Sequence, residues 1–502
     1  MSSTDNLNRR EFINKAGKAA ATAATFSIVP AHVLAKSGKI PPSDKITVAN
    51  IGCGTQGLRE MGEMLVNPKI QVIAVCDPNK YSTDYLDWSA HGIRNNIRKV
   101  LNDKSWGEGV TGIPGGRDVA QKYVNQYYKQ KKACKAYEDF RDLLEKEKDL
   151  DVVKVMTPDH THAPIAIAAM KKKVHVITHK PIANRLAEGR LTIETTRQEK
   201  VLTNLLAWKP ISDHKLILDW INDGAIGTLK EIHNWSFRPV WPQWHLEPTD
   251  TPPIPKNFNW DLWLGPVPDR PYHPNFTHNV FRGWYDFGGG SIADMGHYSL
   301  FPLFDNFGID RGPTSVKAYG TTNRQVINQV CRGVKNDSAF PYSSMVRFKF
   351  PAQRALPAFD LFWYDGGMKP FAPPELEADD RDIPFEGMMF VGDKGKILAS
   401  FLGENPEIIP SARMKAYEGE KQVKKADEVD RTATWAESIL NNEEAGGSFL
   451  KAGTVTDTIN LGAIAIRTGK KLEFDSENMK ITNEKSANQY LTREYRKGWE
   501  MG

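Results

Sequence analysis

Two groups of polar residues in this 502-residue chain have the types and the spacing that proton transfer requires. The first contains Lys180, which comes just after the apolar run 174–178 and immediately before Pro181, so its amine is held in place. A lysine amine that is shielded from water has a lowered pKa and can exchange a proton near neutral pH. The same position also suits an ordinary lysine exposed to water at the end of a strand.

The second group lies in the glycine-rich stretch 286–298, where a helix is expected to start. Asp294 and His297 are three residues apart, so they share one face of that helix. A carboxylate beside an imidazole orients the ring and supports its charged form. Such a pair is suited to accept the proton of a hydroxyl group that is being oxidised, although the same spacing is also typical of structural hydrogen bonds.

The element that must position these groups is an apolar run, 46–51, which ends in a Gly-x-Gly-x-x-Gly pattern before a helix-like segment. Gly52 permits a tight turn, Gly54 lets the backbone approach a pyrophosphate, and Gly57 allows close packing of helix and strand. The same ligand is expected to contact the two residues within the turn, Thr55 and Gln56.

A second apolar run, 70–76, ends in Asp77, twenty positions after the last glycine of the pattern. A carboxylate at this position accepts the 2′-hydroxyl of the adenosine ribose and repels a 2′-phosphate. Together the two runs predict a dinucleotide site that binds NAD in preference to NADP.

Short apolar runs alternate with helix-like segments up to about residue 210, which predicts a doubly wound parallel sheet of the Rossmann type. We assign residues 44–210 to this NAD-binding domain, with an insertion at about 81–136. Ligands of such sheets bind beyond the carboxyl ends of the strands. The strand ends carry the other expected cofactor contacts, which are Pro158, His160, His162 and Lys180.

Residues 211–502 contain longer strands with alternating hydrophobicity. They predict a C-terminal α/β domain with an open, mainly antiparallel mixed sheet, which we expect to bind substrate and to support a homo-oligomer. Six tryptophans fall within 235–284, largely in a proline-rich loop, where they suit a platform for sugar rings, a subunit contact or plain packing. The candidate substrate contacts are Trp208, Trp241, Trp284 and Tyr298.

The composition argues against several other classes of protein. The chain is 40% hydrophobic and 25% charged, as in soluble globular enzymes, and part of its net charge of +5 comes from residues 1–36. That distribution gives no electrostatic reason to expect nucleic-acid binding. The four cysteines lack CxxC spacing, and the pattern around His160, His162 and His179 is not typical of metal ligands. We therefore expect neither disulfides nor a metal.

Residues 1–36 have the form of a twin-arginine export signal. Arg9 and Arg10 precede an alanine-rich, weakly apolar stretch, 19–31, which is followed by small residues. This stretch is too short and too weakly apolar to anchor the mature chain in a membrane. We expect a periplasmic or otherwise exported protein, and a disordered basic tail on a cytoplasmic protein is the alternative.

Taken together, the export signal, the glycine pattern, Asp77, the stretch 157–162, Lys180-Pro181 and the stretch 288–297 resemble the Gfo/Idh/MocA oxidoreductases. This is the family of glucose-fructose oxidoreductase and inositol dehydrogenase, and the similarity covers nearly all of residues 44–400. The resemblance implies the two domains described above, bound NAD(P) and sugar or cyclitol substrates. It also implies a catalytic lysine at Lys180 and an Asp/His pair at Asp294 and His297.

The chain departs from the family pattern at three places. His179 stands where a glutamate usually precedes Lys-Pro, and this changes the charge beside the lysine. The family more often spaces its Asp and His by four residues, and Tyr298 occupies that fourth position, so it is kept as a reserve for His297. Lys173 and Val174 replace a Gly-Lys pair, which affects only a turn.

These observations predict an NAD-dependent oxidoreductase that oxidises a secondary hydroxyl of a sugar, glycoside or cyclitol. Lys180 would share the hydroxyl proton, His297 would accept it, and Asp294 would orient His297. Free NAD is scarce outside the cytoplasm, so we expect an exported enzyme to keep its cofactor. The alternatives are a glycoside hydrolase or lyase that oxidises C3 transiently with recycled NAD, and a non-catalytic sugar-binding protein.

Overall fold

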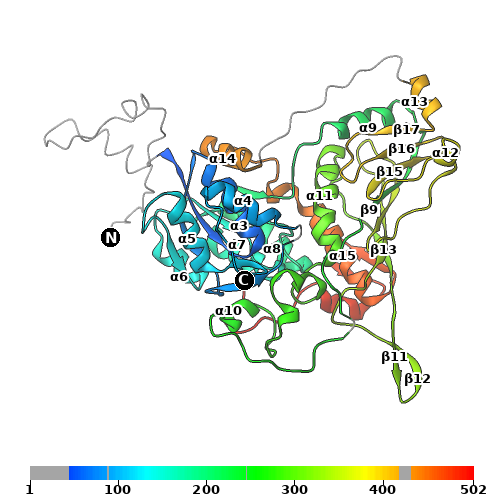
Figure 1. Ribbon diagram of the computed structural model, residues 1–502. Helices are drawn as coiled ribbons and strands as arrows, with labels where there is room; N and C mark the ends of the chain where they lie inside the picture. Colours follow the sequence, from blue (N-terminus) through cyan, green and yellow to red (C-terminus); the bar gives the residue numbers. More distant parts are fainter. Residues whose placement is uncertain (1–43, 88–89, 245, 418–430, 502) are drawn as a thin grey trace, which may run out of the picture.

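The computed structural model describes residues 44–87, 90–244, 246–417 and 431–501 (Figure 1). The export signal expected at 1–36 lies outside these residues. None of the described helices combines the length and the apolar character that a membrane crossing requires.

The first half of the described chain is organised around six parallel strands in the order β5-β2-β1-β6-β7-β8. The central strands are mostly apolar because helices cover both faces of the sheet, and β1 is buried along its whole length. This confirms the predicted doubly wound parallel sheet. The strands are β1 (Ile46–Ile51), β2 (Ile70–Cys76), β5 (Lys135–Tyr137), β6 (Val152–Val155), β7 (His175–Thr178) and β8 (Thr203–Leu205).

Two groups of helices cover this sheet, one on each face. The strand order reverses between β1 and β6, and a crevice at such a reversal is where open parallel sheets bind ligands. One face carries α3 (Thr55–Val66), α4 (Gly92–Leu101) and α5 (Arg117–Tyr127), and the other carries α6 (Phe140–Lys146), α7 (His162–Met170) and α8 (Leu186–Glu199).

The stretch expected as an insertion, 81–136, is only partly additional to the sheet. Strands β3 (Ser82–Tyr85) and β4 (Ile113–Gly115) pair with each other in antiparallel fashion and, with α4, form the added part. Helix α5 and strand β5 instead continue the regular alternation, because β5 pairs with β2 in the parallel sheet. Because this region is polar, its sequence did not indicate that the alternation of helix and strand continues there.

In the second half, the described residues form a nine-stranded sheet in the order β17-β16-β15-β9-β14-β13-β10-β18-β19. Only β9 and β14 pair in parallel, so the predicted mixed, mainly antiparallel sheet is confirmed. The strands are β9 (Leu229–Trp235), β10 (Ser315–Gly320), β13 (Ser344–Phe350), β14 (Phe359–Tyr364), β15 (Gly387–Gly392), β16 (Lys396–Ala399), β17 (Glu407–Ile409), β18 (Leu472–Asp475) and β19 (Lys480–Ile481).

Helices α11 (Gly290–Phe307) and α15 (Gly453–Thr468) lie between the two sheets (Figure 1). Their apolar residues join those of both sheets in one continuous core cluster. The remaining helices are α9 (Asp213–Asn222), α10 (Trp260–Leu264), α12 (Pro374–Glu377), α13 (Ser411–Tyr417) and α14 (Arg431–Asn441), and a separate hairpin is made by β11 (Asn323–Ile327) and β12 (Val330–Val334).

Helix α14 returns to the first half of the molecule although it belongs to the later part of the sequence (Figure 1). Its Trp435 is fully buried in the core cluster that contains Met61 of α3. Lys69 and Glu437 form an ion pair of 2.9 Å at the edge of this contact. The chain therefore crosses between the two halves more than once.

Gly462 provides a test of the shared core, because a Cβ atom there would lie 2.8 Å from Ile292 Cδ1 and 2.9 Å from Phe348 Cζ. We expect Gly462→Val to lower the free energy of unfolding by about 1–3 kcal/mol, since extra carbons in a close-packed core force neighbours aside. Thermal unfolding followed by circular dichroism measures this. Gly333→Val, where no atom lies within 4 Å of an added Cβ, is the control, and an equal loss there would contradict the interpretation.

Candidate functional site

The glycine turn after β1 has the tight geometry that the sequence predicts. Gly52 has a φ of +98°, and a Cβ atom there would lie 2.5 Å from the carbonyl carbon of Met156. A Cβ on Gly57 would lie 2.1 Å from the carbonyl oxygen of Gly52. Side chains at either position would therefore separate β1 from α3 or from β6. At Gly54 an added Cβ would lie 2.8 Å from the ring of Tyr85, so the added part of the first half packs beside the turn.

This turn opens into a cleft that is continuous with solvent and is lined by residues from both halves of the molecule. The cleft lies between the two halves, at the carboxyl ends of β1 and β6. Among the expected cofactor contacts, it is lined by Gly52, Gly54, Thr55, Gln56, Gly57, Asp77 and Pro158. Lys180, also expected to contact the cofactor, does not line the cleft, although the neighbouring His179 does. The second half contributes Leu262, Trp263, His278, Phe281, Arg282 and Trp499.

Asp77 faces this cleft from the end of β2. Its carboxylate accepts hydrogen bonds from the backbone N–H of Cys53, at 2.6 Å, and from that of Asn79, at 2.7 Å. Burial raises the pKa of Asp77 in spite of these two donors. The side chain thus ties the end of β2 to the glycine turn, and the first turn of α3 contains no acidic residue that would oppose a bound diphosphate.

His160 and His162 were expected to contact the cofactor, and the structure corrects that expectation. Neither lines the cleft, and both rings are fully buried. The ring nitrogens of His160 lie 2.9 Å from the carbonyl oxygen of Trp263 and 3.3 Å from that of Phe287. Those of His162 lie 2.6 Å from Pro181 O and 2.8 Å from Thr157 O. Both histidines therefore hold backbone segments together behind the cleft.

Lys180 and Asp294 meet in the interior, at the junction of the two halves. The Lys180 amine follows β7 and donates a hydrogen bond to Asp294 Oδ1 on α11. Burial lowers the pKa of Lys180 to about 8, although Asp294 acts in the opposite direction. The amine also lies 4.9 Å from the centre of the Tyr298 ring. The structure thus brings together three of the residues expected to act on the substrate.

The expected hydrogen bond between Asp294 and His297 is not formed, which corrects the orienting role assigned to Asp294. His297 Nδ1 lies 2.9 Å from the carbonyl oxygen of Ala293, one helical turn earlier, so this nitrogen carries the hydrogen and Nε2 is the acceptor. Nε2 is buried without a hydrogen-bond partner among the described residues. Burial lowers the pKa of His297 to about 3, so the ring is neutral.

Arg282 and His179 also belong to the site, and the sequence did not single out their roles. Arg282 lines the cleft, and its Nε lies 3.3 Å from Asp294 Oδ1. Burial would raise the pKa of Asp294, but Lys180 and Arg282 lower it below its usual value. His179 also lines the cleft, and its Nε2 lies 3.1 Å from the Tyr298 hydroxyl. Arg282 lies in the short 3-10 helix η5 (His278–Gly283) and no motif marks it, whereas His179 was visible as a departure from the family pattern.

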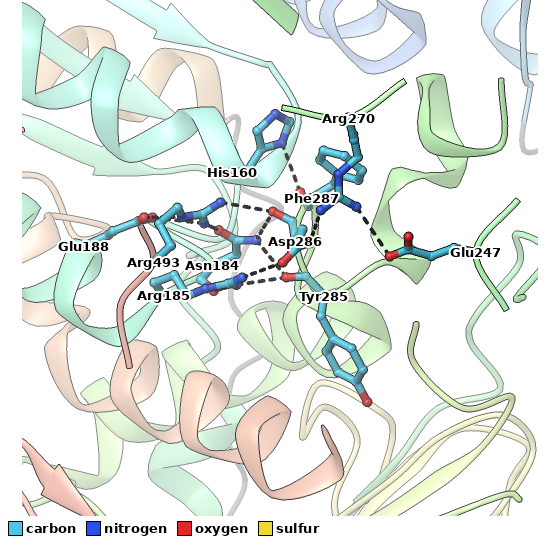
Figure 2. A network of polar contacts seen from close by, with 10 residues as sticks. All are labelled: His160, Asn184, Arg185, Glu188, Glu247, Arg270, Tyr285, Asp286, Phe287 and Arg493. Carbon is cyan, nitrogen blue, oxygen red and sulfur yellow. Dashed lines mark hydrogen bonds and ion pairs between the residues drawn. The ribbon is translucent and has the colours of Figure 1, made fainter. Parts of the chain in front are cut away.

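A polar network fixes the loop that precedes α11 (Figure 2). The Asp286 carboxylate forms ion pairs with Arg185, at 3.2 Å, and with Arg270, at 2.5 Å. Its carbonyl oxygen accepts a hydrogen bond from Arg493, which also pairs with Glu188 of α8 at 2.6 Å. The N–H of Gly289 donates to Asp159 Oδ2 at 3.1 Å. These contacts tie the start of α11, and with it Asp294, to the half that carries Lys180.

Of the four expected substrate contacts, only Tyr298 lies in this cluster. Trp284 is buried in an aromatic core with Trp260 and Trp263. Trp241 is also buried, and the indole N–H of Trp208 donates to Asp305 at 3.0 Å. Packing therefore explains Trp284, because the proline-rich loop forms a small core of its own, and Trp208 is partly buried against the main core.

No group of histidine, cysteine and carboxylate side chains within the described residues is arranged to hold a metal ion. The described cysteines are all free, and three of the four, Cys53, Cys76 and Cys134, are buried.

Asp77 offers a direct test of cofactor choice. We expect Asp77→Ser to weaken NADH binding by about 10- to 100-fold, the effect of losing a charge-assisted hydrogen bond, while NADPH binding is unchanged or improved. Fluorescence titration with each cofactor measures both constants. Glu138→Gln, another carboxylate lining the cleft, is the control, and equal weakening of NADH and NADPH would contradict the role of Asp77.

Comparison with known proteins extends this description. A model described as the NAD-binding Rossmann fold of an oxidoreductase family matches residues 46–205. A model described as the C-terminal alpha/beta domain of the same family matches residues 214–332 and 375–501. The crystal structure of the WlbA dehydrogenase from Bordetella pertussis in complex with NADH and UDP-GlcNAcA has a similar fold, with a TM-score of 0.50 and 12% identity over 86% of this chain and 99% of that one.

The similar curated sequences match a smaller part of this chain. A glycosyl hydrolase family 109 protein from Shewanella baltica is 24% identical over 239 residues, which are 45% of this chain and 44% of that protein. A levoglucosan dehydrogenase from Pseudarthrobacter phenanthrenivorans is 31% identical over 117 residues, or 22% of this chain and 30% of that protein. The chain thus matches less than half the length of these relatives. The two family models, by contrast, together span most of the described residues, and the chain belongs to the Gfo/Idh/MocA oxidoreductase family.

Proposed function

We propose that this protein oxidises a secondary hydroxyl of a sugar, glycoside or cyclitol. The observation that carries the proposal is the buried contact between Lys180 and Asp294, formed by the two halves of the molecule next to the cleft that holds the glycine turn. Bound NAD would supply the hydride acceptor. The residues that would hold it are the glycine turn and Asp77, whose geometry fits a diphosphate and a ribose.

Lys180 is the group that would move the hydroxyl proton. With a pKa of about 8, a useful fraction of the amine is neutral near neutral pH and can accept a proton from the substrate. Asp294 holds this amine in place. Arg282 forms an ion pair with the same carboxylate, and its charge disfavours a second positive charge nearby. The three side chains therefore favour exchange of a proton at the Lys180 amine.

His297 would act as a neutral hydrogen-bond acceptor beside Lys180. Its Nδ1 is occupied by the Ala293 carbonyl, so its free Nε2 is available to a hydroxyl group. Because its pKa is about 3, the ring stays uncharged over the working pH range. It would therefore orient the hydroxyl by accepting a hydrogen bond and would leave the proton to Lys180. Tyr298, which contacts His179, remains the reserve for this role.

A second candidate function is cleavage of a glycosidic bond with no net change in the oxidation state of the cofactor. The relatives named as family 109 glycosyl hydrolases favour it. It also suits the proposed export of the chain through its twin-arginine pattern, since a protein that works where free NAD is scarce must recycle the molecule it carries. Assembly as a homo-oligomer and the boundaries 44–210 and 211–502 remain part of the same proposal.

Incubation with p-nitrophenyl glycosides separates the two candidates. If the protein oxidises the glycoside, a keto product and net NADH absorbance should appear when NAD is supplied. Lys180→Ala should lower the rate at which both form by at least about 100-fold, because a proton-transfer group is lost. Release of p-nitrophenol without added cofactor and without net NADH would favour the second candidate. Full activity of Lys180→Ala would overturn both.

The pH profile tests the role of the Lys180 amine. Below its pKa the amine is protonated and cannot accept a proton, so kcat/KM should fall as the pH drops through about 8 and level off above it. Asp294 raises the pKa of Lys180, so Asp294→Asn should move the midpoint to lower pH.

Steady-state kinetics between pH 6 and 10 measure this shift. Glu138→Gln, which removes a carboxylate from the cleft wall without touching Lys180, should leave the midpoint unchanged. A profile of Asp294→Asn that matches the wild type would rule out Lys180 as the titrating group.

A further inference from the structure

The segment that follows β19 returns from the second sheet to the first half of the molecule. It includes the short 3-10 helix η7 (Lys485–Tyr490) and reaches the dinucleotide cleft at Trp499, whose side chain lines the cleft wall. Figure 1 marks the C-terminus among the elements of the first half. No sequence motif draws attention to residues 491–501, the part of this segment that follows η7, and we call these residues the strap.

Charged contacts fasten the strap on both sides of the cleft. The Arg496 guanidinium pairs with Asp261 of α10 at 2.7 Å and with Asp269 at 2.8 Å. On the opposite side, Arg141 of α6 donates a hydrogen bond to the carbonyl oxygen of Gly498 at 3.2 Å. The strap is thus held both by the second half of the molecule and by the half that carries the glycine turn.

Trp499 lines the cleft on the side where α6 begins. Its ring centre is 5.9 Å from that of Phe140, which opens α6 directly after the end of β5. The Arg141 guanidinium lies 4.7 Å from the Trp499 ring centre and orients the indole. Strand β5 is the neighbour of β2, and Asp77, expected at the adenosine ribose, ends β2. Ile165 and Leu262 also line the cleft and add apolar surface to it.

We propose that Trp499 and Phe140 form the wall against which the adenine ring of the cofactor packs, and that the strap keeps the dinucleotide from leaving. The inference rests on the proposed use of NAD. Aromatic side chains next to a ribose-binding carboxylate match a purine base, which presents a flat apolar face and stacks on aromatic rings. Because Arg496 and Arg141 both hold the strap, the adenosine half exchanges only when these contacts open.

Ligand fragments test the wall directly. After removal of retained cofactor, isothermal titration calorimetry with AMP, ADP-ribose, NAD⁺ and nicotinamide mononucleotide gives four dissociation constants for each variant. We expect Trp499→Ala to weaken AMP, ADP-ribose and NAD⁺ by the same factor, about tenfold or more, and to leave nicotinamide mononucleotide unchanged. Trp499→Phe should restore most of the loss, and Lys497→Ala, an exposed residue of the same strap, should behave as wild type.

The rate of cofactor release tests the strap as a fastening. Arg496→Ala should increase the NADH dissociation rate, measured by displacement with excess NAD⁺ in a stopped-flow instrument, about tenfold or more. The thermal unfolding midpoint of each variant is measured as a check on the fold. It should stay close to the wild-type value, because buried residues near the strap, such as Met501, are not changed.

The outcomes separate this inference from the function on which it rests. Wild-type protein that binds none of the four ligands would overturn both. If the wild-type protein binds AMP and NAD⁺ and Trp499→Ala binds both with the same dissociation constants, the adenine wall alone is overturned. Equal weakening of nicotinamide mononucleotide in that variant would also overturn it, since the effect would then not depend on adenine.

Discussion

The buried contact between the Lys180 amine and the Asp294 carboxylate is the interaction on which the rest of the site depends. Removing two charges from water costs several kcal/mol for each ion, and their attraction offsets that cost only when the geometry is held closely. One charge comes from the end of β7 and the other from α11, so the two halves must be aligned to keep them paired. The network around Asp286 and the bond from Gly289 to Asp159 provide that alignment.

A third charge makes the pair suited to proton transfer. A lysine that shares a carboxylate with no other cation would keep its proton firmly, because the charged form would be the stabilised one. Arg282 contacts the same carboxylate, and its charge opposes the positive form of Lys180. Burial acts in the same direction. The amine is therefore held in position by Asp294 without being locked in its protonated state.

Local geometry explains which parts of this arrangement could be predicted from the sequence. The glycine turn and Asp77 are properties of a short strand-turn-helix unit, so residues 46–77 contain nearly all of the information. The parallel sheet is predicted by apolar runs that alternate with helix-like segments, and the mixed sheet by strands with alternating hydrophobicity. His160 and His162 were misjudged because a polar residue at a strand end does not reveal which carbonyl groups will face it. The roles of Arg282 and Trp499 depend on how distant segments fold back onto the cleft, and no local pattern encodes that.

The same dependence on distant segments links chemistry to cofactor retention. The first half supplies the glycine turn, Asp77 and Lys180, whereas the second supplies Asp294, His297, Arg282 and the strap. Neither half alone contains both a proton acceptor and the carboxylate that holds it. Arg493 lies in the strap, and it also bonds to the carbonyl oxygen of Asp286 in the loop that positions α11. A single segment therefore connects the proposed adenine wall with the placement of Asp294, so the same residues hold together the wall of the cofactor cleft and the proposed proton-transfer site.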